Sequence, residues 1–162
     1  MKEFRSVRNQ FLSDHFQDSY ANSNSILLSF TRPTTQVDPI LWLPMTCSER
    51  SRVLRWRLGW LPGGKPKECI LHPGHNWSRR HVYECLSVHD RLYLPRSIED
   101  PISFLLNLLP LHKLRPTDHH NWVVQWPILC TILHELDYYF HDECPPPPED
   151  PGAELLSWLF EQ

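Results

Sequence analysis

The sequence predicts a mostly α-helical fold in which short helices lie in an irregular, loop-rich arrangement. Three observations lead to this fold class. Apolar residues recur at helical spacing in several segments, prolines stand where these segments begin or end, and no segment shows the alternation of a β-strand. With 41% hydrophobic residues and seven Trp, the 162-residue chain has the apolar material for one core, so we expect one compact unit.

The first part of the chain, residues 1–45, is predicted to form a helix followed by an irregular connector. Prolines in the connector each remove a backbone donor and restrict the preceding residue. The helix is indicated by apolar residues at the spacing of one helix face, namely Phe4, Val7, Phe11, Leu12 and Phe16.

The second part, residues 46–96, contains two predicted helices. Thr46 and Glu49 have the spacing of a capping box, which predicts the start of the first helix, and the "LPGG" that follows predicts its end. Ser78 is predicted to cap the second helix, which runs to about Leu94.

The last two parts, residues 97–144 and 145–162, continue the helical pattern. Asp100 is a predicted cap, with Pro101 in the first helical position, where proline is favoured. A broad apolar stripe then predicts a longer helix with Pro127 at its start. The run "CPPPPEDPG" is predicted to be a stiff linker, and "AELLSWLFEQ" a short amphipathic helix able to dock on the body.

Two cysteines and two histidines have the spacing of a zinc site. Cys69, His72, His81 and Cys85 read C-x2-H-x8-H-x3-C, which gives two close pairs separated by a loop, the spacing that is usual in tetrahedral zinc sites. His81 and Cys85 lie one turn apart on one face of the predicted helix. His75 is an alternative to His72. Four protein ligands leave no open position for a catalytic water, so a bound zinc ion would be structural.

The opposite interpretation is that these thiols are packing residues and the histidines surface groups, because free cysteine is often buried for packing alone.

A second histidine-containing segment, "HELDYYFH", lacks the second His of a zinc-protease helix, since Tyr138 stands in its place. His134, Asp137 and His141 share one helix face, but a catalytic metal there is the weaker hypothesis. We therefore expect no enzymatic activity.

Formal charge divides the chain sharply. Residues 50–96 carry ten Lys/Arg and three Asp/Glu, a net charge of +7, whereas residues 97–162 carry two and eleven, a net charge of −9. The basic segment predicts a polyanionic partner, RNA or DNA, or else pairing with the acidic C-terminal third. The residues predicted to contact phosphates are Arg50, Arg52, Arg55, Arg57, Lys65, Lys67, Arg79 and Arg80.

Composition also bears on location. The five cysteines are an odd number and no apolar signal segment precedes them, so we expect reduced thiols in an intracellular protein, nuclear or cytoplasmic rather than secreted. No apolar run approaches the length of a membrane span, so no membrane partner is expected.

Several of these segments together resemble a known family. The run from Asp38 to Pro95, the segment "DPISFLLNLLP" and the run from Trp126 to Leu159 are similar to the C-terminal region of reverse transcriptases encoded by non-LTR (LINE-type) retrotransposons. The most specific parts are "RWRLGWLPGG" and the Cys/His cluster, and the resemblance extends over nearly the whole chain.

The resemblance implies that the cluster is the family's zinc knuckle, a Cys/His site that follows the polymerase domain and helps to hold nucleic acid. Cys69 then matches the first ligand, His81 the third and Cys85 the fourth, while His72 stands where a second Cys is common. The polymerase aspartates and an endonuclease domain are missing from this chain.

Two functions follow as hypotheses. The first is a non-catalytic, zinc-stabilised nucleic-acid-binding tail derived from a retrotransposon reverse transcriptase. The alternative is a protein interaction or assembly module, without metal or nucleic acid, that docks on a polymerase body or another protein through its C-terminal helix.

Overall fold

The computed structural model describes residues 2–22, 31–32, 34, 36–59, 66–113 and 120–160, and each structural statement below refers to this part of the chain. Within it the protein is mostly helical, with seven α-helices, one 3-10 turn and no strand. Of the residues discussed above, Lys65 and the "LPGG" segment lie outside it. No described helix is both long and apolar enough to cross a membrane.

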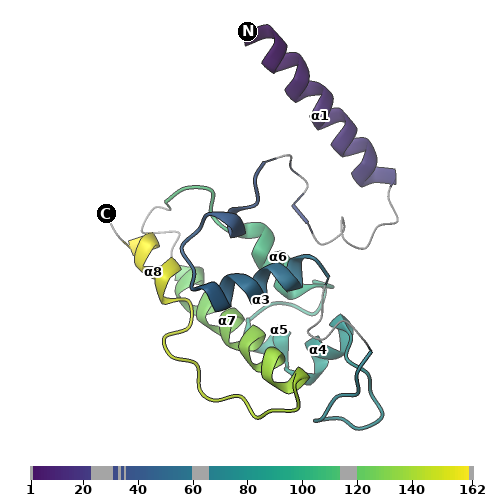
Figure 1. Cartoon of the computed structure of the whole chain (residues 1–162), viewed down its shortest axis with the longest axis vertical. Coiled ribbons are helices and arrows are strands. Elements are labelled where there is room, and N and C mark those ends of the chain that lie inside the picture. The colour runs from purple at the N-terminus through teal and green to yellow at the C-terminus, as the bar shows by residue number, and fades with distance from the viewer. Residues whose placement is uncertain are drawn as a thin grey trace.

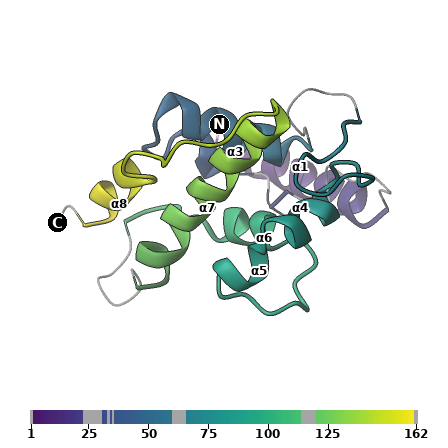
Figure 2. The same cartoon turned by 90° about the horizontal axis from the view of Figure 1, so that it is seen from below.

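Figure 1 shows how the helices are arranged along the chain. They are α1 (Lys2–Asn22), the 3-10 turn η1 (Pro39–Leu41), α3 (Cys47–Arg57), α4 (Arg79–Cys85), α5 (Val88–Arg91), α6 (Pro101–Leu108), α7 (His120–Phe140) and α8 (Ala153–Phe160). Helix α7 is the axis of the body, and α3 lies along it (Figure 1). Helices α4, α5 and α6 gather on another side of it (Figure 2).

The predicted capping box is present at the start of α3, and one of its members also reaches α8. Glu49 N donates to Thr46 Oγ1 over 3.2 Å, and Thr46 N donates to Glu49 Oε2 over 3.0 Å. The other carboxylate oxygen of Glu49 accepts the N–H of Gly152 over 2.6 Å. One carboxylate therefore joins the starts of two helices that are far apart in the sequence.

The C-terminal helix docks on the body, as the sequence analysis allowed. Leu155 and Leu159 of α8 are buried in the core, and Trp158 meets Trp42 edge to face at 6.1 Å. The chain enters α8 through Gly152, which has φ +76° and lies against the indole of Trp126. A side chain at this position would be strained in backbone and would collide with that ring, so glycine is required.

The predicted helix from Ser78 to about Leu94 is wrong in its length. The structure contains two helices, α4 and α5, separated at Ser87, which has the left-handed φ of 49°. In one continuous helix Val88 would point about 120° away from Val82. The break brings both valines into the core, where each is fully buried.

The predicted start of the helix that contains Pro127 is also wrong. Helix α7 begins at His120, so Pro127 lies inside it rather than at its first turn. Interior proline costs about 3 kcal/mol or more, but the added turns bury Trp122 and Trp126, and one large buried side chain contributes about 1.5–3 kcal/mol. The carbonyl that Pro127 leaves unpaired belongs to Val123, which is exposed.

Helix α1 confirms the predicted N-terminal helix, but its apolar residues are not buried. It stands away from the body in Figure 1, and Phe4, Val7 and Phe11 are each about two-thirds or more exposed. The described body does not cover this helix.

Replacing Glu49 with alanine is expected to lower the free energy of unfolding by about 2–4 kcal/mol, because the capping box and the Gly152 N–H lose their acceptor. Urea unfolding followed by tryptophan fluorescence measures the change. Glu154→Ala is the control, since Glu154 is an exposed acid in the first turn of α8 and should contribute about 0.5 kcal/mol or less. Equal losses in the two variants would contradict the predicted role of Glu49.

Candidate metal centre

The first half of the candidate site is a tight turn between residues 67 and 77. The turn is closed by hydrogen bonds from Trp77 N to Lys67 O and from Cys69 N to His75 O, both 2.8 Å. Gly74 adopts φ +86°, which glycine does without strain. Cys69 is buried at the base of this turn, whereas residues 70–76 are exposed.

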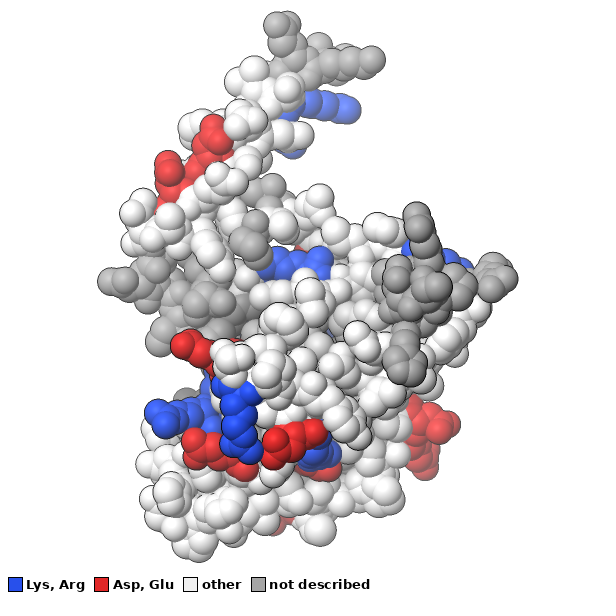
Figure 3. All heavy atoms as spheres, turned by 180° about the vertical axis from the view of Figure 1, so that it is seen from behind, with Lys and Arg blue, Asp and Glu red and all other residues white. Residues whose placement is uncertain are grey.

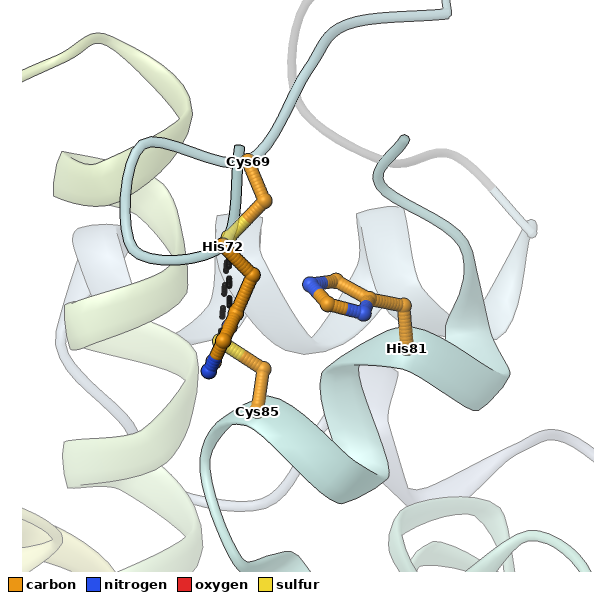
Figure 4. A group of neighbouring side chains, drawn as sticks. All are labelled: Cys69, His72, His81 and Cys85. Carbon is orange, nitrogen blue, oxygen red and sulfur yellow. Dashed lines mark hydrogen bonds between the residues drawn. The ribbon is translucent and has the colours of Figure 1, made fainter. Parts of the chain in front are cut away.

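The second half of the site is helix α4. Ser78 caps it, as predicted, by accepting the N–H of His81 over 3.1 Å. His81 and Cys85 are one helical turn apart, and both side chains point toward the turn that carries Cys69 and His72 (Figure 4). The turn and the helix therefore contribute two side chains each.

The four side chains are close enough to hold one metal ion. The sulfurs of Cys69 and Cys85 are 3.8 Å apart, and the sulfur of Cys69 is 3.9 Å from Nδ1 of His72. All four ligand atoms lie within 4.8 Å of one another, and among the described residues no other group of three or more such side chains does so. A tetrahedral zinc ion holds two sulfurs about 3.8 Å apart and a sulfur and a nitrogen about 3.6 Å apart.

The two cysteines are free thiols, since their sulfurs are far beyond the S–S bond length of about 2.05 Å. Burial, followed by the hydrogen bond and charge of Cys69, raises the pKa of Cys85 to about 12. Without an ion, Cys85 therefore holds its proton at neutral pH. A metal ion binds the thiolate form and would have to displace this proton.

The surroundings of His81 favour its coordination of a metal ion. Its Nε2 atom is buried and has no hydrogen-bond partner in the described structure, which is costly for a polar atom unless something else binds it. Desolvation, then the neighbouring His72 and His75, lowers the pKa of His81. The ring is therefore neutral at pH 7, the form in which imidazole coordinates metals.

The structure separates the two alternatives for the remaining histidine. The His72 ring belongs to the group of four and meets His81 edge to face at 5.4 Å. His75 instead stacks flat on His81, with an interplanar angle of 8°, and is not a member of the group. His72 is thus the better placed of the two.

Side chains behind the site attach it to the C-terminal end of α7. Lys67, at the start of the turn, donates to the carbonyl of Phe140 over 2.6 Å and to Asp142 over 2.7 Å. Trp77, at the end of the turn, is buried between His81 and Phe140, with ring centroids 5.4 and 6.2 Å away. No motif in the sequence signals the contacts to Phe140 and Asp142, which join residues more than 60 positions apart.

Most of the predicted phosphate-binding residues are in contacts within the chain. Arg52 and Arg55 both pair with Asp137 at 3.0 Å, and Lys67 with Asp142. Arg50 donates to the carbonyls of Ile40 and Leu43. Arg57 pairs with Asp38 and donates to Asn107. Arg79 pairs with Asp100, donates to Ser103 and lies over the Trp56 ring. Arg80 is the exception, because it is 90% exposed and pairs only loosely with Glu84 at 3.5 Å.

The surface carries no obvious polyanion-binding patch on the face seen in Figure 3, where basic and acidic side chains lie beside one another in one band. A groove of about 550 Å³ runs beside α4, between Arg80 and Arg96, with Tyr83 and His89 in its wall. A second hollow of about 460 Å³ shares Arg80 and Tyr83 with it. The groove itself was not predicted, because the break between α4 and α5 beside it has no sequence signal.

The weaker candidate set, His134, Asp137 and His141, does not come together as a metal site. Asp137 is held by two arginines, His134 donates from Nε2 to the carbonyl of Pro146 over 2.9 Å, and His141 is exposed. The buried thiol nearby, Cys130, has a raised pKa through burial and the carboxylate of Glu49, so it is not an activated nucleophile.

Replacing Asp137 with asparagine is expected to reduce stability at neutral pH by about 1–3 kcal/mol, with a difference that disappears in acid. Burial acts to raise the pKa of Asp137, but hydrogen bonds from Arg55 and Arg52 outweigh it, so the pKa lies below its ordinary value. A depressed pKa contributes stability above the unfolded-state pKa, and this is lost as the pH falls through the folded-state pKa.

Urea unfolding of both proteins from pH 7 down to about pH 2 tests this dependence. Asp90→Asn is the control, because Asp90 forms an exposed pair with Arg96 that contributes little at any pH. A difference for Asp137→Asn that does not change with pH would argue against the ion pairs as its source.

Comparison with known proteins adds no family assignment, since no protein-family model, curated protein or solved structure matches this chain. The resemblance to non-LTR reverse transcriptases stays a prediction from the sequence.

Proposed function

We propose that Cys69, His72, His81 and Cys85 bind one structural zinc ion, and that the chain is a non-catalytic module stabilised by this ion. The observation that carries the proposal is the convergence of two thiols and two imidazoles within 4.8 Å. Two sulfur and two nitrogen ligands are a set that zinc prefers, and with all four positions filled no substrate water can bind.

The ion's task is to hold the turn against α4. Residues 70–76 of the turn are exposed, so the turn buries little apolar surface of its own. A zinc ion bound by two residues of the turn and two of α4 would replace the missing hydrophobic contacts, and its binding free energy would add to the stability of the folded state.

Purified protein is expected to contain about one zinc ion per chain, measured by elemental analysis, and removal by a chelator should lower Tm by about 5 °C or more. Cys85→Ser and His72→Ala should lose the ion. His75→Ala is the matched control, since His75 lies beside the group without belonging to it. A chain without zinc, or equal losses in His72→Ala and His75→Ala, would count against this assignment.

Nucleic-acid binding is a second candidate function, and the groove beside α4 favours it. Arg80 and Arg96 are 90% and 76% exposed and are paired only with exposed carboxylates, so exchange of those partners for phosphates costs little. This function agrees with the expected origin as a reverse transcriptase tail. The internally paired arginines of α3 would then support the fold rather than contact the ligand.

Fluorescence anisotropy with labelled single-stranded RNA and DNA tests this candidate. Binding should weaken steeply between about 50 and 200 mM salt, and Arg80→Ala/Arg96→Ala should reduce affinity about tenfold. Arg5→Ala on α1 is the control, an exposed arginine outside the groove. The absence of binding at low salt, or unchanged affinity in the double variant, would contradict nucleic-acid binding at this groove.

The assembly function expected of the C-terminal helix has less support. Leu155 and Leu159, the apolar residues that such docking would use, are buried in this chain's own core, and the helix is attached to α3 through Glu49. A partner at this site would have to displace those contacts.

A further inference from the structure

Cys69 and Cys85 are close enough to react with each other. Their sulfurs are 3.8 Å apart, so they must approach by about 1.8 Å to reach the length of a disulfide bond. Cys69 lies in a turn whose following residues are all exposed, and the turn is closed by only a few backbone hydrogen bonds. A small movement of the turn toward α4 therefore supplies the approach.

The two sulfurs differ in their access to solvent. Cys85 is half-buried, whereas Cys69 is 1% exposed. A small oxidant therefore reaches the sulfur of Cys85 first, and Cys69 is in place to act second. Two further thiols, Cys47 and Cys144, are exposed, and neither belongs to the group of four.

We propose that this thiol pair is a redox-sensitive release device for the zinc ion, an inference that rests on the proposed metal site. Hydrogen peroxide oxidises the Cys85 thiolate to a sulfenic acid and releases hydroxide. The Cys69 thiolate then attacks that sulfur, forms the S–S bond and expels a second hydroxide.

The reaction balances without another co-reactant. Two electrons pass from the two thiolates to the peroxide, whose O–O bond breaks, and two protons from solvent convert both hydroxides to water. Zinc leaves because disulfide sulfurs are poor ligands and the two imidazoles of His72 and His81 hold it weakly on their own. The new bond keeps the turn attached to α4, so the ion is released while the body stays folded.

The experiment uses the full chain, reduced and loaded with zinc, and treated with hydrogen peroxide. Zinc content is measured first, release is then followed with a chromophoric chelator, and peptide mapping by mass spectrometry locates the disulfide. About one zinc ion per chain should be released, together with a loss of about 2 Da for one Cys69–Cys85 bond. A thiol reductant and added zinc should restore the starting state.

Cys47→Ser/Cys144→Ser is the matched control and should respond as the wild-type chain does, since neither thiol is in the site. Zinc that stays bound under peroxide, or release with a Cys85–Cys144 bond or sulfinic acid in place of the Cys69–Cys85 bond, would overturn this inference alone. A reduced chain that holds no zinc before peroxide is added would overturn the proposed function and this inference with it.

Discussion

The fold depends on the neutralisation of a basic segment by an acidic one along helix α7. Asp137 pairs with Arg52 and Arg55 of α3. Glu135 forms two hydrogen bonds with Arg91 of α5. Lys67, in the turn of the candidate metal site, pairs with Asp142 just past α7. These contacts attach three successive parts of the basic segment to one helix. Apolar contacts provide most of the burial energy, and the ion pairs add specific contacts between each part and α7 or the residues just past it.

Because of this neutralisation, the charge pattern of the sequence is weaker evidence for a nucleic-acid partner. A net charge of +7 over residues 50–96 is a reasonable sign of a nucleic-acid partner when position is unknown. In the folded chain most of these cations have a carboxylate or carbonyl partner. Releasing one of them would lose the interaction with that partner and disturb the packing around it. Only exposed cations such as Arg80 and Arg96 can change partners cheaply.

The candidate metal centre lies where the fold has little hydrophobic burial. The turn that carries Cys69 and His72 is mostly exposed, and its anchors are Lys67, Cys69 and Trp77 at its two ends. A bound ion would secure the middle of the turn, where hydrophobic burial is absent. The Nε2 atom of His81 is consistent with this role, because no described residue donates a hydrogen bond to it or accepts one from it.

The sequence by itself determined the mostly helical fold class, the caps of α3, α4 and α6, and the candidate site apart from the choice between His72 and His75, because caps and ligand spacing are local patterns. Only the tertiary structure decided the break at Ser87, the position of Pro127 inside α7, the preference for His72 over His75, and the partners of the arginines. Each of these depends on contacts between distant segments, where burial of Val88 or Trp126 outweighs local preference.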